Sequence, residues 1–301
     1  MTAVASPKTA RTKTRSLRVI PGFGLSLGYT VFYLSIIVLI PLSTIFLKSA
    51  QIGLSGMWRI MSDPRVLAAF NLSFGSAFAA ALTNVFAGVL IAWVLVRYRF
   101  PGVRLIDALI DLPFALPTSV AGISLAAVYA NTGYLGRYLE SGVIGLPALA
   151  GHHFALHFPP VKIAYTGHGV YIALLFIGLP FIVRTVQPVL EELGADVEEA
   201  AASLGASRWQ TIVRVIFPMM LPALLTGFSL AFARGLGEYG SVIFISNNKP
   251  FEGEILPKLI IEKLEQFNYP GATTIGVLML LASFALLLTV NVLQRWASRW
   301  Q

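Results

Sequence analysis

Six long apolar segments recur along the chain, and they constrain its fold more than any other feature. A helix needs about 20 apolar residues to cross the hydrocarbon core of a bilayer, and the segments are close to that length or longer. They cover about residues 25–47, 66–96, 108–130, 168–186, 219–244 and 274–292. Backbone polar groups in lipid must be hydrogen-bonded internally, which helices achieve. The sequence therefore predicts an all-α integral membrane protein with about six transmembrane helices.

The composition supports a membrane location and excludes other classes. Hydrophobic residues make up 56% of the 301 residues and charged residues 12%, which is too apolar for a soluble domain. The net charge of +8 is compatible with nucleic-acid binding. Membrane proteins, however, commonly concentrate Lys and Arg on cytoplasmic loops, so we expect lipid and not nucleic acid as the partner. The chain has no cysteine and therefore no disulfide or thiol nucleophile.

The distribution of basic residues predicts the topology. Residues 1–20 form a basic arm without apolar periodicity, and the membrane domain follows over residues 21–301. Six spans place both termini on one face, which carries 13 Lys and Arg against 8 on the other, with Arg234 inside a span. Lys and Arg are enriched on the cytoplasmic side, so we expect both termini to be cytoplasmic. The first segment is too long for the apolar core of a signal peptide, and we expect it to be retained.

The third apolar segment contains two prolines and an acidic residue in the stretch DLPFALPTSVAG, residues 111–122. Pro113 and Pro117 cannot donate backbone hydrogen bonds, and a broken helix survives in the membrane only when it packs against protein or lines a wet cavity. One interpretation is a gate or pathway element that includes Asp111, Pro113 and Pro117. The other is a kinked span with Asp111 near the membrane interface.

The fifth segment contains two charges, Arg234 and Glu238, one helical turn apart. Residues at this spacing can form an ion pair. Arg234 follows Pro218 by 16 residues, or about 24 Å along a helix, which places it toward the outer side of the membrane. In one interpretation the pair is structural and holds the outer end of this segment against a neighbour. In the other, Arg234 provides positive potential along a pathway for an anion.

A polar loop, about residues 187–218, separates the fourth and fifth segments, and its pattern predicts two short helices. Asp196 with Glu199 fits an acidic variant of a capping box, and Ser207 with Gln210 fits a second one. Gly205 lies between them, where a left-handed residue commonly ends a helix. The first helix has an apolar face with three members: Val197, Ala201 and Leu204. A DNA-reading helix-turn-helix is one interpretation, but a position between membrane segments favours a stiff cytosolic loop.

The histidines in the connection before the fourth segment do not predict a metal site. His153 and His157 have the i, i+4 spacing of a metal-binding pair, but the sequence places no carboxylate nearby. We therefore expect neither a metal nor a cofactor.

The polar loop resembles the EAA loop of permease subunits from binding-protein-dependent ABC importers. EAAASLG, residues 199–205, supplies the EAA and glycine positions, and an apolar element ending in Pro218 follows at the family's spacing. Val215 and Phe217 differ from the usual Ile and Leu but remain apolar. Further stretches resemble the T-type permease subunit of sulfate/thiosulfate importers, at residues 97–102, 111–122, 183–194 and 236–248. The resemblance covers nearly the whole chain from Pro21 onward.

The resemblance implies a transport subunit of the bacterial inner membrane and not an enzyme. Such a subunit pairs with a homologous W-type permease, two cytosolic ATP-binding subunits and an extracytoplasmic sulfate-binding protein, and it translocates sulfate and thiosulfate into the cytoplasm. The loop would act as a coupling helix in the ATPase, defined by Glu199 and Gly205, with Ala200 and Ala201 as small packing surfaces. The chain has no GxxxxGKS/T motif, so ATP energy must come from another subunit.

Two alternatives remain open on the sequence. Molybdate and tungstate resemble sulfate in shape and charge, so a permease for those oxyanions would have similar features. A secondary anion transporter could also contain proline-broken spans and an intramembrane Arg–Glu pair, and it would work without an ATPase. The capped helix pair argues against that second alternative, because few such proteins need a stiff cytosolic loop.

Overall fold

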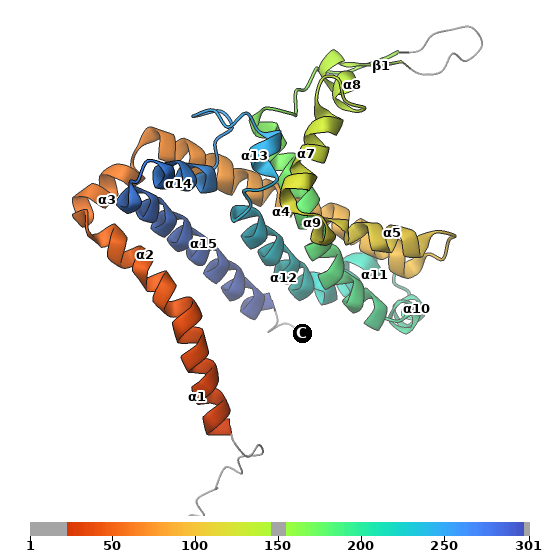
Figure 1. Ribbon diagram of the computed structural model, residues 1–301. Coiled ribbons are helices and arrows are strands. Elements are labelled where there is room, and N and C mark those ends of the chain that lie inside the picture. The colour runs from red at the N-terminus through yellow and green to blue at the C-terminus, as the bar shows by residue number, and fades with distance from the viewer. Residues whose placement is uncertain (1–22, 146–154, 298–301) are drawn as a thin grey trace, which may run out of the picture. The chain divides into compact units, whose positions relative to one another are not determined.

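The computed structural model describes residues 23–145 and 155–297 and divides the chain into two units, residues 1–47 and 48–301 (Figure 1). Helices account for most of the described residues in both units, which confirms the predicted fold class. The basic arm, residues 1–20, lies outside the described residues, and so does His153. The predictions made for them stay predictions.

The first unit is an apolar helix that is long enough to cross a bilayer. α1 (Phe23–Leu34), a π-helical turn (Ser35–Leu39) and α2 (Ile40–Ala50) follow one another without a break, and α2 continues into the second unit. The predicted first span, residues 25–47, lies within this helix. None of its most apolar stretch is buried, as suits a helix that is surrounded by lipid or by another chain.

Long helices form the centre of the second unit, namely α4 (Pro64–Arg97), α9 (Gly167–Glu192) and α12 (Phe217–Leu236). A fourth helix, α15 (Tyr269–Ala297), packs against α12. α11 (Arg208–Thr211) and a π-helical turn precede α12, so one helical stretch runs from the polar loop to Leu236. The last part of the predicted fifth segment, residues 237–244, lies beyond this stretch. With the helix of the first unit, five helical stretches in the described residues are long and apolar enough to span a membrane.

Close packing of α4 on α9 explains why the second apolar segment is rich in small residues. A Cβ on Gly88 would lie 2.7 Å from a side-chain carbon of Ile182 in α9, so only glycine permits this approach. Asn84 donates a 3.0 Å hydrogen bond to the Leu175 carbonyl, which adds a polar link to the apolar interface. The other buried residues on this part of α4 are alanines: Ala77, Ala80, Ala81 and Ala92.

The third apolar segment forms three short helices instead of one span over residues 108–130. These are α5 (Val103–Ile110), α6 (Leu112–Ala115) and α7 (Thr118–Tyr129). Pro113 lies in the first turn of α6, and Pro117 is the N-cap residue of α7. Proline lacks an amide donor and disfavours helical geometry in the residue before it, so each proline separates two helices. The predicted break is confirmed, and none of the three helices is by itself long enough to span a membrane.

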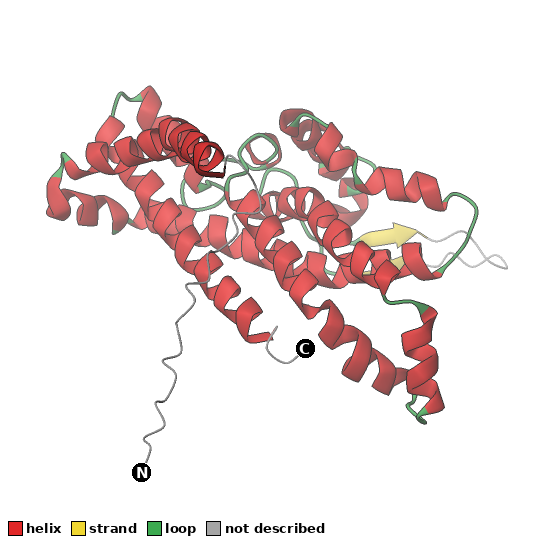
Figure 2. Ribbon diagram, turned by 90° about the horizontal axis from the view of Figure 1, so that it is seen from below, coloured by secondary structure: helices red, strands yellow, loops and turns green. Residues whose placement is uncertain are grey.

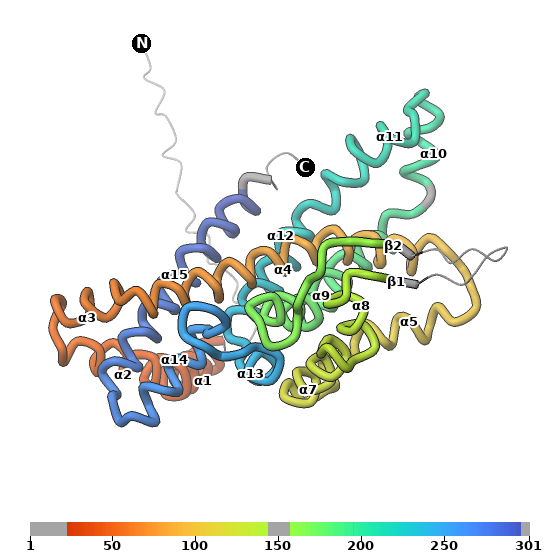
Figure 3. Tube along the Cα trace, turned by 90° about the horizontal axis from the view of Figure 1, so that it is seen from above, coloured from red at the N-terminus to blue at the C-terminus, as the bar shows by residue number. Residues whose placement is uncertain are grey.

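The connection between α7 and α9 contains a short β-hairpin, which is the one departure from an all-α architecture in the described part of the chain (Figure 2). After α8 (Gly136–Ser141), β1 (Val143–Gly145) pairs antiparallel with β2 (Ala155–His157). α13 (Val242–Ile245) follows α12 and lies beside α7, as Figures 1 and 3 show. α7 and the start of α13 approach closely, because a Cβ on Gly122 of α7 would lie 2.3 Å from the carbonyl oxygen of Ser241, the N-cap residue of α13.

Two further helices, α3 (Gly53–Met61) and α14 (Leu256–Glu265), precede α4 and α15 respectively. An ion network attaches α14 to the start of α4. Arg65 lies 2.7 Å from both Glu254 and Glu262, and Lys258 lies 2.6 Å from the same two carboxylates. Hydrogen bonds from Lys258 and Arg65 lower the pKa of Glu262 from its ordinary value to about 2. Glu262 is therefore charged throughout the physiological pH range.

Candidate functional site

The polar loop folds as two short helices with a break at Gly205. α10 (Ala195–Ser203) precedes the break and α11 follows it. Gly205 has φ +81°, the left-handed conformation expected of a glycine that ends a helix. The Ala206 amide donates a 3.0 Å hydrogen bond to the Ala201 carbonyl, which closes the helix end. A Cβ on Gly205 would contact nothing within 4 Å, so backbone conformation alone requires glycine here.

One of the two predicted capping boxes forms. The Ser207 hydroxyl accepts a 3.3 Å hydrogen bond from the Gln210 amide, and the Gln210 side chain accepts a 2.8 Å bond from the Ser207 amide. The capping box predicted for Asp196 and Glu199 is wrong, because α10 begins at residue 195 and Gly194 occupies the N-cap position. Asp196 lies inside the first turn, where its carboxylate still interacts favourably with the helix dipole.

The predicted coupling residues divide between the surface and the interior of the loop. Glu199 and Ala200 are exposed on α10. Ala201 is only 8% exposed and faces inward. Glu199 and Ala200 can therefore contact another protein, whereas Ala201 supports the packing of α10.

Two large apolar side chains on the loop are exposed. Leu204 is 89% exposed, so the prediction that it shares a buried face with Val197 and Ala201 is wrong. It follows the last residue of α10, where the helical periodicity no longer applies. Trp209 of α11 is 72% exposed. Large apolar groups exposed together beside Gly205 are typical of a surface that binds another protein.

Arg97 links the end of α4 to the start of the loop, a contact that the sequence did not predict. Its Nη2 donates a 2.8 Å hydrogen bond to the carbonyl of Leu193 and lies 2.7 Å from Oε1 of Glu198 in α10. A pocket of about 580 Å³ lies beside this link, and its lining includes Glu199 and Arg208. The loop is thus fixed to the membrane helices at both of its ends, by Arg97 and by continuity with α12.

The predicted ion pair of the fifth segment is present. Arg234 Nη1 lies 2.6 Å from Glu238 Oε2, and Glu238 Oε1 accepts 2.9 Å hydrogen bonds from the amide and hydroxyl of Ser241. Glu238 lies just beyond α12 and is 3% exposed, whereas the side chain of Arg234 is 37% exposed. A charged group in contact with lipid is costly, so the exposed part of Arg234 needs water or another protein chain as its neighbour.

Asp111 has a different partner from Arg234. Arg184 of α9 donates two hydrogen bonds to Asp111, of 2.8 and 2.6 Å, and also lies 2.7 Å from Asp107. Arg184 lies toward the loop end of α9, whereas Arg234 lies toward the end of α12 that is away from the loop. Asp111 and Arg234 are therefore held by separate partners, whereas Thr118, next to Pro117, lies beside Gly240 near Glu238. The partnership of Arg184 with Asp111 could not be predicted from charge alone, because 73 residues separate the two.

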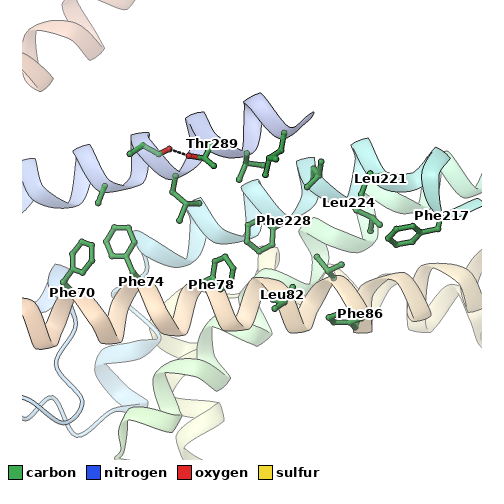
Figure 4. A pocket seen from close by; sticks show the side chains of 17 residues that line it. Phe70, Phe74, Phe78, Leu82, Phe86, Phe217, Leu221, Leu224, Phe228 and Thr289 are labelled. Atoms are coloured by element: carbon green, nitrogen blue, oxygen red, sulfur yellow. Dashed lines mark hydrogen bonds between the residues drawn. The ribbon is translucent and has the colours of Figure 1, made fainter. Parts of the chain in front are cut away.

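The described residues offer no metal cluster, and their apolar groove is unsuited to an anion. No group of three or more His, Asp or Glu residues is placed to hold a metal ion in the described part of the chain. The groove has a volume of about 850 Å³ and lies between α4, α12 and α15. Figure 4 shows Phe74 and Phe78 of α4 beside it, with Phe228 of α12 opposite and Thr289 on α15. Burial of a divalent anion against this lining would be very costly, whereas lipid chains or an apolar helix would fit.

Spanning helices with internal ion pairs, two of them joined by a stiff polar helix pair, are typical of the membrane-embedded subunit of a transporter. Residues 84–301 match the family described as binding-protein-dependent transport system inner membrane component. The match includes well over half of the chain, which therefore belongs to this family.

Relatives within this family are similar over nearly their full lengths. The chain is 48% identical over 273 residues to the sulfate transport system permease protein CysT of Synechocystis sp., covering 90% of this chain and 89% of the relative. It is 44% identical over 279 residues to the protein of the same name from Escherichia coli, covering 93% and 95%. A chain of a bacterial alginate ABC transporter, solved with a periplasmic protein, has a TM-score of 0.70 at 16% identity and covers 90% and 93%. That structural likeness shows the fold alone.

Proposed function

We propose that this chain is the membrane-spanning subunit of an ATP-driven importer that carries sulfate, and also thiosulfate, across the bacterial inner membrane into the cytoplasm. The observation that carries the proposal is the identity of 48% and 44% to two sulfate permeases, over 90% and 93% of this chain. Similarity of that extent includes both the spanning helices and the coupling loop. The chain itself supplies the conduit, and ATP hydrolysis belongs to separate subunits.

The geometry of the loop supports a partnership with two cytosolic ATP-binding subunits. The loop presents Glu199 and Ala200 to solvent beside the exposed side chains of Leu204 and Trp209. The left-handed Gly205 fixes the relation of α10 to α11, which continues into α12. A displacement of α10 by an ATPase would therefore move a spanning helix. We assign the coupling role to Glu199, Ala200, Ala201 and Gly205.

The exposure of Arg234 supports a pathway shared with a second permease of the W type, loaded by an extracytoplasmic sulfate-binding protein. Arg234 lies on a spanning helix, where a wet path between two permeases would be a better neighbour than lipid. Glu238 partly neutralises Arg234, so passing sulfate would meet positive potential without a tight site that slows its release. Pro113 and Pro117 would provide broken backbone along the path, with Asp111 held by Arg184.

Reconstitution tests this function directly. The chain would be co-expressed with its ATPase, second permease and binding protein, and the complex would be inserted into proteoliposomes. We expect uptake of radiolabelled sulfate that requires ATP and all four kinds of subunit and that thiosulfate inhibits. Uptake without the ATPase would contradict the proposal and indicate a secondary transporter. Preference for molybdate or tungstate over sulfate would show that the oxyanion assignment is wrong.

A further inference from the structure

Arg97, the last residue of α4, contacts both elements that meet at the start of the coupling loop. It donates a 2.8 Å hydrogen bond from Nη2 to the carbonyl of Leu193, the C-cap residue of α9. The same nitrogen lies 2.7 Å from Oε1 of Glu198 on α10. The guanidinium also lies over the ring of Trp93, 5.4 Å from its centre. These three contacts hold the guanidinium in one orientation.

The local charges explain why a cation occupies this position. The C-terminal end of a helix carries partial negative charge on its free carbonyls, and the Leu193 carbonyl at the end of α9 points at Arg97. Glu198 adds a full negative charge from the first turn of the next helix. A guanidinium presents several donors in one plane, so Arg97 can serve both groups at once. In this way one side chain ties α4, α9 and α10 together.

The connection between α9 and α10 is restrained by Arg97, by the buried side chain of Leu193 and by Val197, which packs against the core. Gly194 is the N-cap residue of α10 and provides no side-chain cap. The contact between Arg97 and Glu198 is one of charge, since Glu198 Oε1 has no hydrogen bond of good geometry. Nε of Arg97 is buried and has no partner among the described residues. An unsatisfied buried donor costs free energy, so stability alone does not explain why Arg97 occupies this position.

We propose that Arg97 is a positioning residue that fixes the angle between α9 and α10 and thereby keeps ATP hydrolysis coupled to movement of the spans. The proposal rests on the proposed function as an ATP-driven importer. Without Arg97, α10 would still reach the ATPase, but its displacement would be absorbed by rotation at residues 193 and 194. The expected defect is therefore loss of coupling and not loss of assembly.

Spin labels can measure the position of α10 without any transport assay. The chain has no cysteine, so Arg99→Cys and Ser203→Cys would carry the labels, both at exposed positions. In the complete complex, we expect a narrow distance distribution that broadens when Arg97→Gln is added. The matched control is Arg104→Gln, which removes the same charge from an exposed position without an ion pair or hydrogen bond in the described part of the chain. An unchanged distribution in the Arg97→Gln complex would overturn the proposal.

Coupling is measured as sulfate taken up per ATP hydrolysed in proteoliposomes. We expect Arg97→Gln to lower this ratio by about tenfold with basal hydrolysis retained, and Arg97→Lys to give an intermediate value, because lysine keeps the charge but not the planar donors. Glu198→Gln should act in the same direction, and the double variant should be no worse than Arg97→Gln alone. A wild-type complex without ATP-dependent uptake would contradict the proposed function, while the spin labels would still decide the role of Arg97. If the wild-type complex takes up sulfate with ATP hydrolysis and the Arg97→Gln complex has the same ratio of uptake to hydrolysis, the proposal for Arg97 is overturned and the proposed function is not.

Discussion

Gly205 is required by its backbone conformation and not by the space around it. Its φ is +81°, and an added Cβ would meet nothing within 4 Å. A left-handed conformation costs an ordinary residue about 1 to 2 kcal/mol, so Gly205→Val should turn α11 away from its orientation on α10. We expect strongly reduced sulfate uptake with normal insertion, measured by uptake and by the amount of protein in the membrane.

Ala206→Val is the matched control for this variant, because it adds the same side chain at the next residue, where φ is not positive. Glu199→Lys tests the partner surface separately, since it reverses an exposed charge without changing the backbone. It should also abolish uptake while the protein still inserts. Normal uptake with Gly205→Val or with Glu199→Lys would remove the coupling assignment.

Arg234 offers a second test at the level of single residues. Arg234→Ala removes the positive potential from the proposed path, so sulfate uptake should fall by about tenfold or more. Arg234→Lys should retain part of the activity, because it keeps the charge. Copurification with the ATPase should stay intact in both variants. Normal transport by Arg234→Ala, or loss of assembly with Glu238→Gln alone, would show that the Arg234–Glu238 pair is structural.

At the scale of elements, the Arg184 cluster holds α5 and the start of α6 on α9. Arg184→Gln would leave the carboxylates of Asp107 and Asp111 side by side without their cation. All three side chains are partly exposed, so solvent screens the loss, and we expect about 1 to 2 kcal/mol of destabilisation. The thermal midpoint of the purified complex should fall by a few degrees. Arg104→Gln on α5 should leave the midpoint unchanged, and an equal shift in both variants would argue against a stabilising role of the Arg184 cluster.

The attachment of α14 to α4 should weaken as the pH falls below the ordinary pKa of Glu262 and should be constant above it. The pKa of Glu262 is about 2 in the folded protein, below its ordinary value of 4.5. A lowered folded-state pKa contributes stability that is complete above about pH 4.5 and is lost as the pH falls toward 2. Hydrogen exchange of α14 should therefore be constant from pH 8 to 5, after correction for the intrinsic rate, and should accelerate below about pH 4. Glu262→Gln should remove much of this acid dependence, and persistence of the full dependence would exclude Glu262 as its source.

At the scale of the whole molecule, the topology remains a prediction with a direct test. The count of basic residues places both termini in the cytoplasm. Single cysteines in this cysteine-free chain can be probed with a membrane-impermeant maleimide. Positions 48, 134 and 248 should react from outside intact cells, whereas positions 99 and 206 should react only after the cells are opened. Labelling of position 206 from outside would exclude contact of the loop with a cytosolic ATPase.

The features that sequence predicted correctly depend on residues close together in the chain. Apolar length predicts a span because the bilayer thickness is fixed, and five spans have helical counterparts of sufficient length. The Ser207–Gln210 capping box, the left-handed Gly205 and the Arg234–Glu238 pair each depend on residues within four positions of one another. Predictions from local sequence failed where the end of a helix lay one or two residues from its expected position. Gly194 replaced Asp196 as the N-cap, and Leu204 lay beyond the helix and became exposed.

Tertiary structure alone decided which charged side chains that are far apart in the sequence meet. Arg184 and Asp111 are 73 residues apart, and Arg97 and the Leu193 carbonyl are 96 apart. No periodicity connects such positions, and any of several acidic residues or helix ends could satisfy either arginine equally well. The choice follows from packing, because the small residues of α4 bring its backbone against α9. The sequence by itself therefore determined a helical membrane protein with a capped polar loop, and helix packing determined which arginine contacts the start of that loop.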